Sequence, residues 1–117
     1  MLFINLLSNA VIYSHRNGRV YISCRRGPNS EPVVTIADDG IGIPAEKLPH
    51  IFKEHYRTKE AVRHNKESSG LGLAIVRHVA EMYKIRIRVE SRPGLGTKFE
   101  LTFPPLNESL DNEKEGE

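Results

Sequence analysis

Two stretches near the end of the chain alternate strictly between apolar and polar residues, and a glycine-bearing turn at residues 94–96 joins them. A period of two residues puts every second side chain on the same face, so each stretch predicts a β-strand with one buried face. The short turn makes the strands antiparallel neighbours that need a cover for their shared apolar face. The apolar positions are Ile85, Ile87 and Val89 in the first stretch and Phe99, Leu101 and Phe103 in the second.

The rest of the chain supplies that cover and two more strands. Helical spacing predicts helices over residues 2–14 and 71–83, and a short helix near 45–50. Alternation predicts a half-buried strand over 19–25 and an apolar strand over 33–37. We therefore expect an α+β fold, a two-layer α/β sandwich with helices on one face of a mostly antiparallel mixed sheet. The expected inward positions are Phe3, Leu6, Leu7 and Ala10 in the first helix, Leu73, Val76, Val79, Ala80 and Tyr83 in the second, and Val20, Ile22 and Cys24 in the strand.

Composition sets limits on the kind of protein. The 117 residues, 38% apolar and 27% charged, suit one small globular domain, which we place at 1–105. The tail, 106–117, has a net charge of −4 against +6 for the rest, and its scarcity of apolar residues predicts disorder. The single cysteine, Cys24, excludes an internal disulfide and a multi-cysteine zinc site, which fits a cytoplasmic location. No apolar run is long enough for a membrane span, so we expect no direct membrane contact.

Two asparagines interrupt the first apolar helix. Asn5 and Asn9 are one helical turn apart, so they lie one above the other beside the apolar stripe. Their amides are either surface groups or oxygen ligands for a hard cation such as Mg²⁺. Tyr13, one turn further on, is either a core residue or a ring placed against a base.

A loop with two glycines follows the strand at 33–37. Asp38 is either a turn former or an acceptor for an exocyclic amino group, as adenine has and guanine lacks at that position. Gly40 and Gly42 are either hinges or points of close backbone approach to a flat ring.

A second glycine pair opens the helix at 71–83. Gly70-Leu71-Gly72 would place free N–H groups at a helix N-terminus, a plausible phosphate cradle. The polar stretch before it, residues 53–69, carries Arg57 and Lys59 and is either solvated or able to close over a triphosphate. No P-loop motif occurs, and no strand precedes the glycines as a dinucleotide fingerprint requires.

The order of these motifs resembles the N, G1, F, G2 and G3 boxes of sensor histidine kinases, in the superfamily that includes gyrase, Hsp90 and MutL. The matching segments are NLLSNA, DDGIGIP, IFKEHYR, GLGLAIV and GLGTKFEL, which together cover nearly all of residues 2–104. The resemblance implies a Bergerat-type ATP-binding catalytic domain that uses ATP and Mg²⁺. It also implies that the chain starts inside the first helix and lacks an N-terminal edge element.

The resemblance also implies roles for single residues. Asn9 would ligate Mg²⁺, Asn5 would help hold the metal and phosphates, and Tyr13 would lie against adenine. Asp38 would receive the adenine amino group, and Thr97 would help hold a water beside it. Gly40 and Gly42 would shape the pocket. Arg57 and Lys59 would reach the phosphates from a mobile lid. The segment Gly70-Leu71-Gly72 would hinge that lid and offer backbone N–H groups to the phosphates. Asn5 and Arg57 would act in catalysis as well as in binding.

The asparagine at position 5 bears on the reaction. Hydrolysing members of the superfamily carry a glutamate there, whereas the Asn5 amide cannot act as a general base near neutral pH. The resemblance thus implies transfer of the γ-phosphoryl group to a histidine on a separate dimerisation domain of the same kinase, with a response regulator downstream and no nucleic-acid partner. None of the five histidines stands in a phosphoacceptor context.

The sequence departs from the family at two positions and leaves two other functions open. Ile12 stands where a basic residue often precedes the tyrosine, and His55 stands where a second aromatic is usual. The first alternative is a serine kinase of the anti-sigma-factor type, and the second is a non-catalytic regulatory module. An upstream helical domain with a phosphoacceptor histidine would favour the histidine kinase, and a short stand-alone gene would favour the serine kinase.

Overall fold

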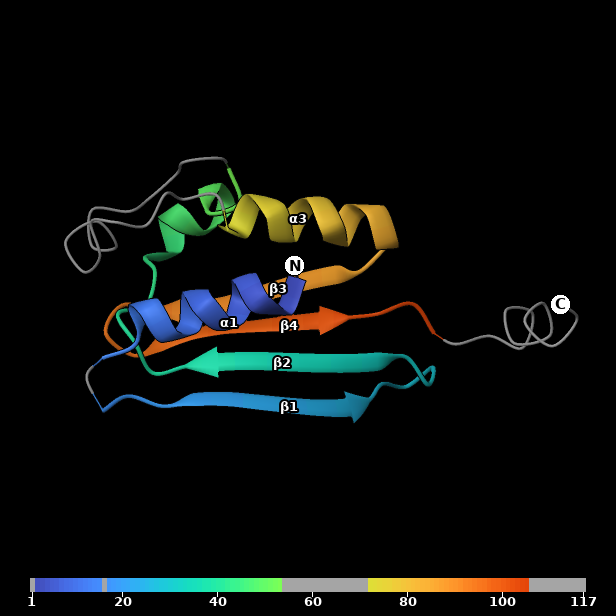
Figure 1. The fold of residues 1–117 in the computed structure, drawn as a ribbon, viewed down its shortest axis with the longest axis horizontal. Coiled ribbons are helices and arrows are strands. Elements are labelled where there is room, and N and C mark those ends of the chain that lie inside the picture. The colour runs from blue at the N-terminus through green and yellow to red at the C-terminus, as the bar shows by residue number, and fades with distance from the viewer. Residues whose placement is uncertain (1, 16, 54–71, 106–117) are drawn as a thin grey trace, which may run out of the picture.

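The computed structural model describes residues 2–15, 17–53 and 72–105, which form a sheet with helices on one side (Figure 1). All three strand pairings among these residues are antiparallel, in the order β1-β2-β4-β3. The expected two-layer α/β sandwich is confirmed, with the helices of one layer packed on the sheet. The elements are α1 (Leu2–Tyr13), β1 (Val20–Arg26), β2 (Pro32–Asp38), the 3₁₀ helix η1 (Ala45–His50), α3 (Gly72–Tyr83), β3 (Arg86–Arg92) and β4 (Gly96–Thr102).

The strand register fixes which side chains share a face. Ile22 faces Ile36, Ile36 faces Phe99, and Phe99 faces Val89 across the four strands. Directly opposed residues of antiparallel strands point to the same side of a sheet. This row therefore points toward the helix layer, as the alternation of the two C-terminal strands predicts.

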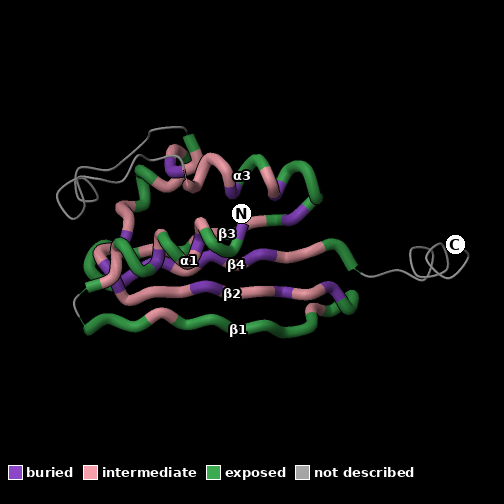
Figure 2. Tube along the Cα trace, viewed as in Figure 1, coloured by how far each residue is buried: buried purple, intermediate pink, exposed green. Residues whose placement is uncertain are grey.

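The core lies between α1, α3 and the middle of the sheet. Its largest fully buried side chains come from both layers, with α1 packed on β2 and on α3. In Figure 2 the buried segments run along β2, β4 and the inner sides of both helices. Burying side chains of this size stabilises the fold by roughly 1.5–3 kcal/mol each. The five are Leu6, Ile36, Val76, Phe99 and Leu101.

The prediction of a half-buried first strand is wrong. Every residue of β1 after Val20 is exposed, including Ile22 at 62% and the free Cys24. The alternation places Ile22 on the helix side correctly, but α1 packs on α3 and on β2 and leaves the edge strand β1 uncovered.

Two helix positions also differ from expectation. Phe3 is 40% exposed and stacks on Phe103, whereas Leu2 takes the buried position that begins the stripe continued by Leu6 and Ala10. At the end of α3, Tyr83 is 63% exposed, while Val76 and Ala80 are buried as predicted. Phe3 lies one position off the buried stripe of α1, and Tyr83 is the last residue of α3.

In the part of the chain that the structure describes, no helix is both long and apolar enough to cross a bilayer.

Candidate functional site

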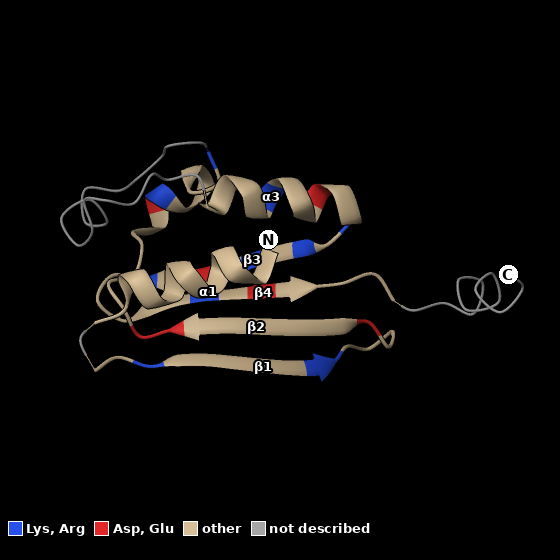
Figure 3. Ribbon diagram, viewed as in Figure 1, with Lys and Arg blue, Asp and Glu red and all other residues tan. Residues whose placement is uncertain are grey.

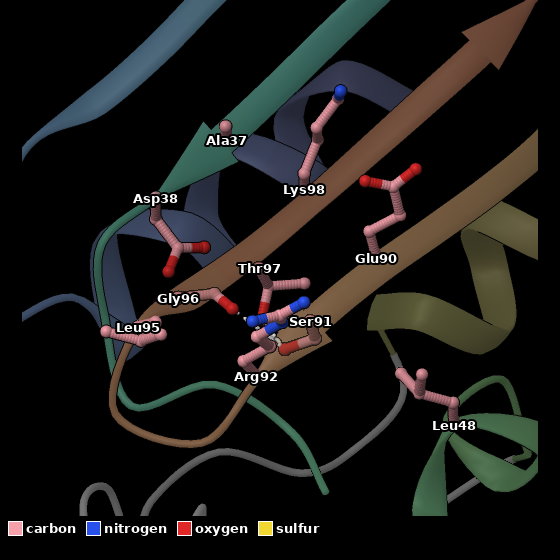
Figure 4. A pocket seen from close by; sticks show the side chains of 10 residues that line it. All are labelled: Ala37, Asp38, Leu48, Glu90, Ser91, Arg92, Leu95, Gly96, Thr97 and Lys98. Carbon is pink, nitrogen blue, oxygen red and sulfur yellow. Dashed lines mark hydrogen bonds between the residues drawn. The ribbon is translucent and has the colours of Figure 1, made fainter. Parts of the chain in front are cut away.

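The ends of three strands meet at one corner of the sheet. Asp38, the last residue of β2, pairs with Thr97 at the start of β4, and Thr97 pairs with Ser91 near the end of β3. A hollow of ≈ 520 Å³ opens at this corner (Figure 4). Its lining consists of Ala37, Asp38, Leu48, Glu90, Ser91, Arg92, Leu95, Gly96, Thr97 and Lys98.

The two adjacent aspartates have different roles. The Oδ1 atom of Asp39 accepts the Arg19 backbone N–H at 2.7 Å, which fastens the start of β1 to the loop. Asp38 instead lines the hollow, and its Oδ1 accepts the Gly40 backbone N–H at 2.9 Å. Asp39 is thus a structural residue, and Asp38 supplies the acceptor of the site.

Burial raises the pKa of the Asp38 carboxyl above its ordinary value. Hydrogen bonds from the backbone N–H groups of Gly40 and Thr97 oppose this rise, the negative charge of Asp39 adds to it, and His15 weakly lowers it. A partly desolvated carboxylate is a stronger acceptor for an N–H donor than an exposed one, because less water competes for it.

Three hydrogen bonds fix the loop after Asp38. The Ile41 N–H reaches the Tyr13 carbonyl at 3.1 Å, and the Ile41 carbonyl accepts the Gly94 N–H at 2.7 Å. The Ile43 N–H reaches the Ser91 hydroxyl at 2.8 Å. The loop is thereby held to the end of α1 on one side and to the β3–β4 turn on the other.

The glycines of this loop are needed by the protein's own packing. A Cβ atom on Gly40 would lie 2.0 Å from the Tyr13 carbonyl oxygen, and one on Gly42, where φ is +72°, would lie 1.9 Å from that of Arg92. Both glycines are buried and neither lines the hollow. They shape the site by letting the loop lie close to its neighbours, and close approach to a ligand ring stays a prediction.

Ser91 was missed by the sequence reasoning. Its Oγ atom contacts the Ile43 N–H, the Gly96 carbonyl at 2.9 Å and the Thr97 hydroxyl at 2.8 Å, so it joins the loop, β3 and β4 (Figure 4). The available signal was a polar residue in phase with the inward row of Ile87 and Val89.

Helix α1 connects this corner to the start of α3. Its Tyr13 carbonyl holds the loop, and eight residues earlier the Asn5 Oδ1 lies 3.4 Å from the place of a Cβ on Gly72. At 1.5 Å per residue these points are about 12 Å apart along the axis. Asn9 is half-buried between them. None of Asn5, Asn9, Tyr13 and Gly72 lines the hollow. The three α1 residues follow one another at intervals of one helical turn, from the loop beside the hollow toward Gly72.

Helix α1 offers no charged group and few ligands for a metal ion. Helix α1 has no charged side chain, as its uniform tan colour in Figure 3 shows. Within the described ranges, no group of three or more His, Cys, Asp or Glu is placed to hold a metal ion. The amides of Asn5 and Asn9 fit a cation only as part of a ligand set completed by other oxygens, as Mg²⁺ with substrate phosphates would be.

Four predicted site residues lie outside the described residues: Arg57, Lys59, Gly70 and Leu71. The predicted acidic tail, 106–117, lies outside them as well.

Among known proteins, the chain is similar in sequence to sensor histidine kinases. The chain is 45% identical over 114 residues to the sensor-like histidine kinase SenX3 of Mycobacterium tuberculosis, covering 97% of this chain and 27% of that protein. It is 37% identical over 102 residues to the sensor histidine kinase YkoH of Bacillus subtilis, covering 87% and 22%. The chain therefore spans about a quarter of the length of these relatives.

Solved structures agree in fold. The mycobacterial sensor histidine kinase MprB superposes with a TM-score of 0.78 at 30% identity, covering 88% of this chain and 70% of that one. The catalytic domain of the histidine kinase ThkA gives 0.69 at 28%, covering 88% and 63%. ShkA, solved in complex with AMPPNP, gives 0.74 at 23%, covering 88% and 20%, a likeness of fold alone.

A family model covers almost the whole chain. The model described as histidine kinase-, DNA gyrase B- and HSP90-like ATPase matches residues 1–107. The chain therefore belongs to this ATPase family, and the relatives and solved structures it is similar to are sensor histidine kinases.

Proposed function

We propose that this domain binds ATP with Mg²⁺ and donates the γ-phosphoryl group to a histidine on a separate dimerisation domain of the same kinase, in the cytoplasm. A response regulator would receive the group next. The observation that carries the proposal is the half-buried acceptor Asp38 at a strand end, connected by one helix to two amides a helical turn apart and to the start of a second helix.

Asp38 would select the base. Its carboxylate has no proton to donate when ionised, so it favours a ring edge that offers an N–H, as the 6-amino group of adenine does. A 6-oxo purine would place its oxygen against the carboxylate oxygen of Asp38, a repulsive contact in place of a hydrogen bond. The orientation is fixed in advance because the Gly40 N–H already holds Oδ1.

The other end of α1 would take the phosphates and the cation. Asn5 lies against Gly72, where α3 begins and where unpaired N–H groups favour an anion. Bound Mg²⁺ would supply charge neutralisation for the leaving group, with Asn9 and Asn5 as its protein ligands. Arg57 and Lys59 would add positive charge that α1 lacks, and Gly70 and Leu71 would add backbone N–H groups.

Asn5 would also restrain hydrolysis. An amide cannot take a proton from water near neutral pH, so ATP would persist until a stronger nucleophile arrives. Transfer would then depend on positioning and charge neutralisation more than on acid–base chemistry by this domain. Incubated with labelled ATP, the chain should label a histidine on a supplied dimerisation domain and should not label itself.

Calorimetry with ATP and Mg²⁺ tests the base assignment. Asp38→Asn should weaken ATP binding by about 30-fold or more, because the amide oxygen would stay on the Gly40 N–H and turn an NH₂ toward the adenine amino group. Asp39→Asn is the matched control, since its amide oxygen can still accept the Arg19 N–H away from the hollow. Equal losses in both variants, or no binding by the parent chain, would refute the proposal.

The metal assignment has a separate test. Asn9→Ala should remove most of the difference between ATP affinities measured with Mg²⁺ and with a chelator. Ser8→Ala, an exposed neighbour on the same helix, should keep that difference. A full magnesium effect in Asn9→Ala would exclude Asn9 as a ligand.

A further inference from the structure

The hydroxyl of Ser91 has all its hydrogen-bonding capacity in use. A serine hydroxyl has one hydrogen and two acceptor lone pairs. The Gly96 carbonyl, 2.9 Å away, can only accept, so the Ser91 hydrogen goes there. The Ile43 N–H, 2.8 Å away, can only donate, so it occupies one lone pair.

The third contact then has only one possible direction. Ser91 Oγ and Thr97 Oγ1 are 2.8 Å apart, and Ser91 has no second hydrogen to give. Thr97 must therefore donate its hydroxyl hydrogen to Ser91. This contact is shielded from competing water, since Thr97 is only 7% exposed and Ser91 is partly buried.

The direction of that hydrogen decides what Thr97 offers to the hollow. With its hydrogen turned to Ser91, Thr97 has only lone pairs left for a ligand or a bridging water. Its register partner Asp38 also accepts only, since its carboxylate takes N–H donors from Gly40 and Thr97. Two acceptors side by side suit a ligand edge rich in N–H groups and oppose a carbonyl there.

We infer that Ser91 is a positioning residue that determines base specificity by fixing the Thr97 hydroxyl as an acceptor. The inference rests on the proposed binding of an adenine nucleotide at this corner and deepens it. Asp38 rejects a 6-oxo purine by its charge, and Thr97 rejects it only as long as Ser91 holds the hydroxyl hydrogen. Without Ser91, the Thr97 hydroxyl can rotate and donate to a carbonyl.

The test compares ATP with inosine triphosphate, whose purine carries an oxygen in place of the 6-amino group and a hydrogen on N1. The parent should prefer ATP. Ser91→Ala should reduce the ratio of the two affinities by about tenfold, the worth of one hydrogen bond changed from repulsive to favourable. Ser91→Thr, which restores a hydroxyl, should restore the parent's ratio. General loosening of the corner would weaken both nucleotides and leave the ratio unchanged.

A double-mutant cycle shows whether Ser91 acts through Thr97. Thr97→Val removes the hydroxyl, so adding Ser91→Ala to that variant should not change the ratio further. Should Ser91→Ala fail to fold, Ser91→Cys keeps the bulk but is a weaker acceptor, and its ratio should fall in the same direction.

The outcomes separate the two proposals. A parent chain that binds neither nucleotide refutes the proposed function itself. A parent that prefers ATP, with the same preference in Ser91→Ala, refutes only the role of Ser91. A further drop of the ratio in the Thr97→Val background would show that Ser91 acts by a route other than Thr97 and would also overturn the inference.

Discussion

Ile22 and Ile36 are directly opposed residues of the same type on paired strands, yet 62% of Ile22 is exposed and only 1% of Ile36. Strand β1 differs in the same way from the three strands that follow it in the chain. Beside the hollow, the backbones of β2, β3 and β4 pack closely and are joined by hydrogen bonds, whereas β1 is open on both faces after its first residue. For side chains on the helix-facing side of the sheet, burial depends on which strand they belong to, because the helix layer covers only part of the sheet.

The largest expected effect comes from the isoleucine pair. Ile36→Ala should lower the free energy of unfolding by about 2–5 kcal/mol, as truncating a buried isoleucine leaves a cavity. Ile22→Ala should cost less than about 1 kcal/mol, since water already contacts most of its side chain. Urea unfolding of both variants measures the difference. Equal losses would mean that β1 is covered in solution and would remove the contrast.

Two glycines of the β3–β4 turn sharpen the same contrast. Both have positive φ, +78° at Gly94 and +108° at Gly96. A Cβ on Gly94 would meet nothing within 4 Å, whereas one on Gly96 would lie 1.9 Å from the Asp38 carbonyl oxygen. Gly94→Ala should cost about 1 kcal/mol from its backbone conformation, and Gly96→Ala about 2–3 kcal/mol because β2 and β4 must also separate. Thermal unfolding is the measurement, and similar costs would show that the corner can yield.

Asp38 should make the corner sensitive to pH. Its raised pKa means that the folded chain holds the proton more tightly than the unfolded chain does. This group's stabilising contribution is therefore complete below the unfolded pKa, falls as pH rises toward the folded pKa, and stays low above it. Asp38→Asn should flatten this part of the stability–pH curve and leave the fold as stable as the parent, or more so, at neutral pH. A variant less stable than the parent at pH 7 would contradict this.

The smallest expected effect concerns Cys24, on the helix-facing side of β1 and exposed. A thiol reagent should modify it in the native chain at nearly the rate seen in denaturant, and Cys24→Ser should change the unfolding free energy by less than about 0.5 kcal/mol. Protection of this thiol by a hundredfold or more would show that something covers β1.

Much of the fold was predictable because local periodicity specifies elements and faces. The alternation of Phe99 and Leu101 and the helical spacing of Leu6 and Ala10 are both confirmed. Which strands the helix layer covers was not predictable, because the alternation around Ile22 is the same whether or not a helix packs on that strand. Asp38 and Thr97 are brought together as expected. Ser91 was missed because a serine in a strand has no motif of its own, and its importance depends on contacts distant in sequence.

The length of helix α1 sets the distance between two parts of the site. Toward one end, the Asn5 Oδ1 lies 3.4 Å from the place of a Cβ on Gly72, and at the other end the Tyr13 carbonyl accepts the Ile41 N–H. Inserting a single residue between Asn5 and Tyr13 would lengthen the helix by about 1.5 Å and rotate one end against the other by about 100°. Either the placement of Asn5 beside Gly72 or the Tyr13–Ile41 hydrogen bond would then be lost. The number of residues in this helix is therefore constrained independently of their chemistry.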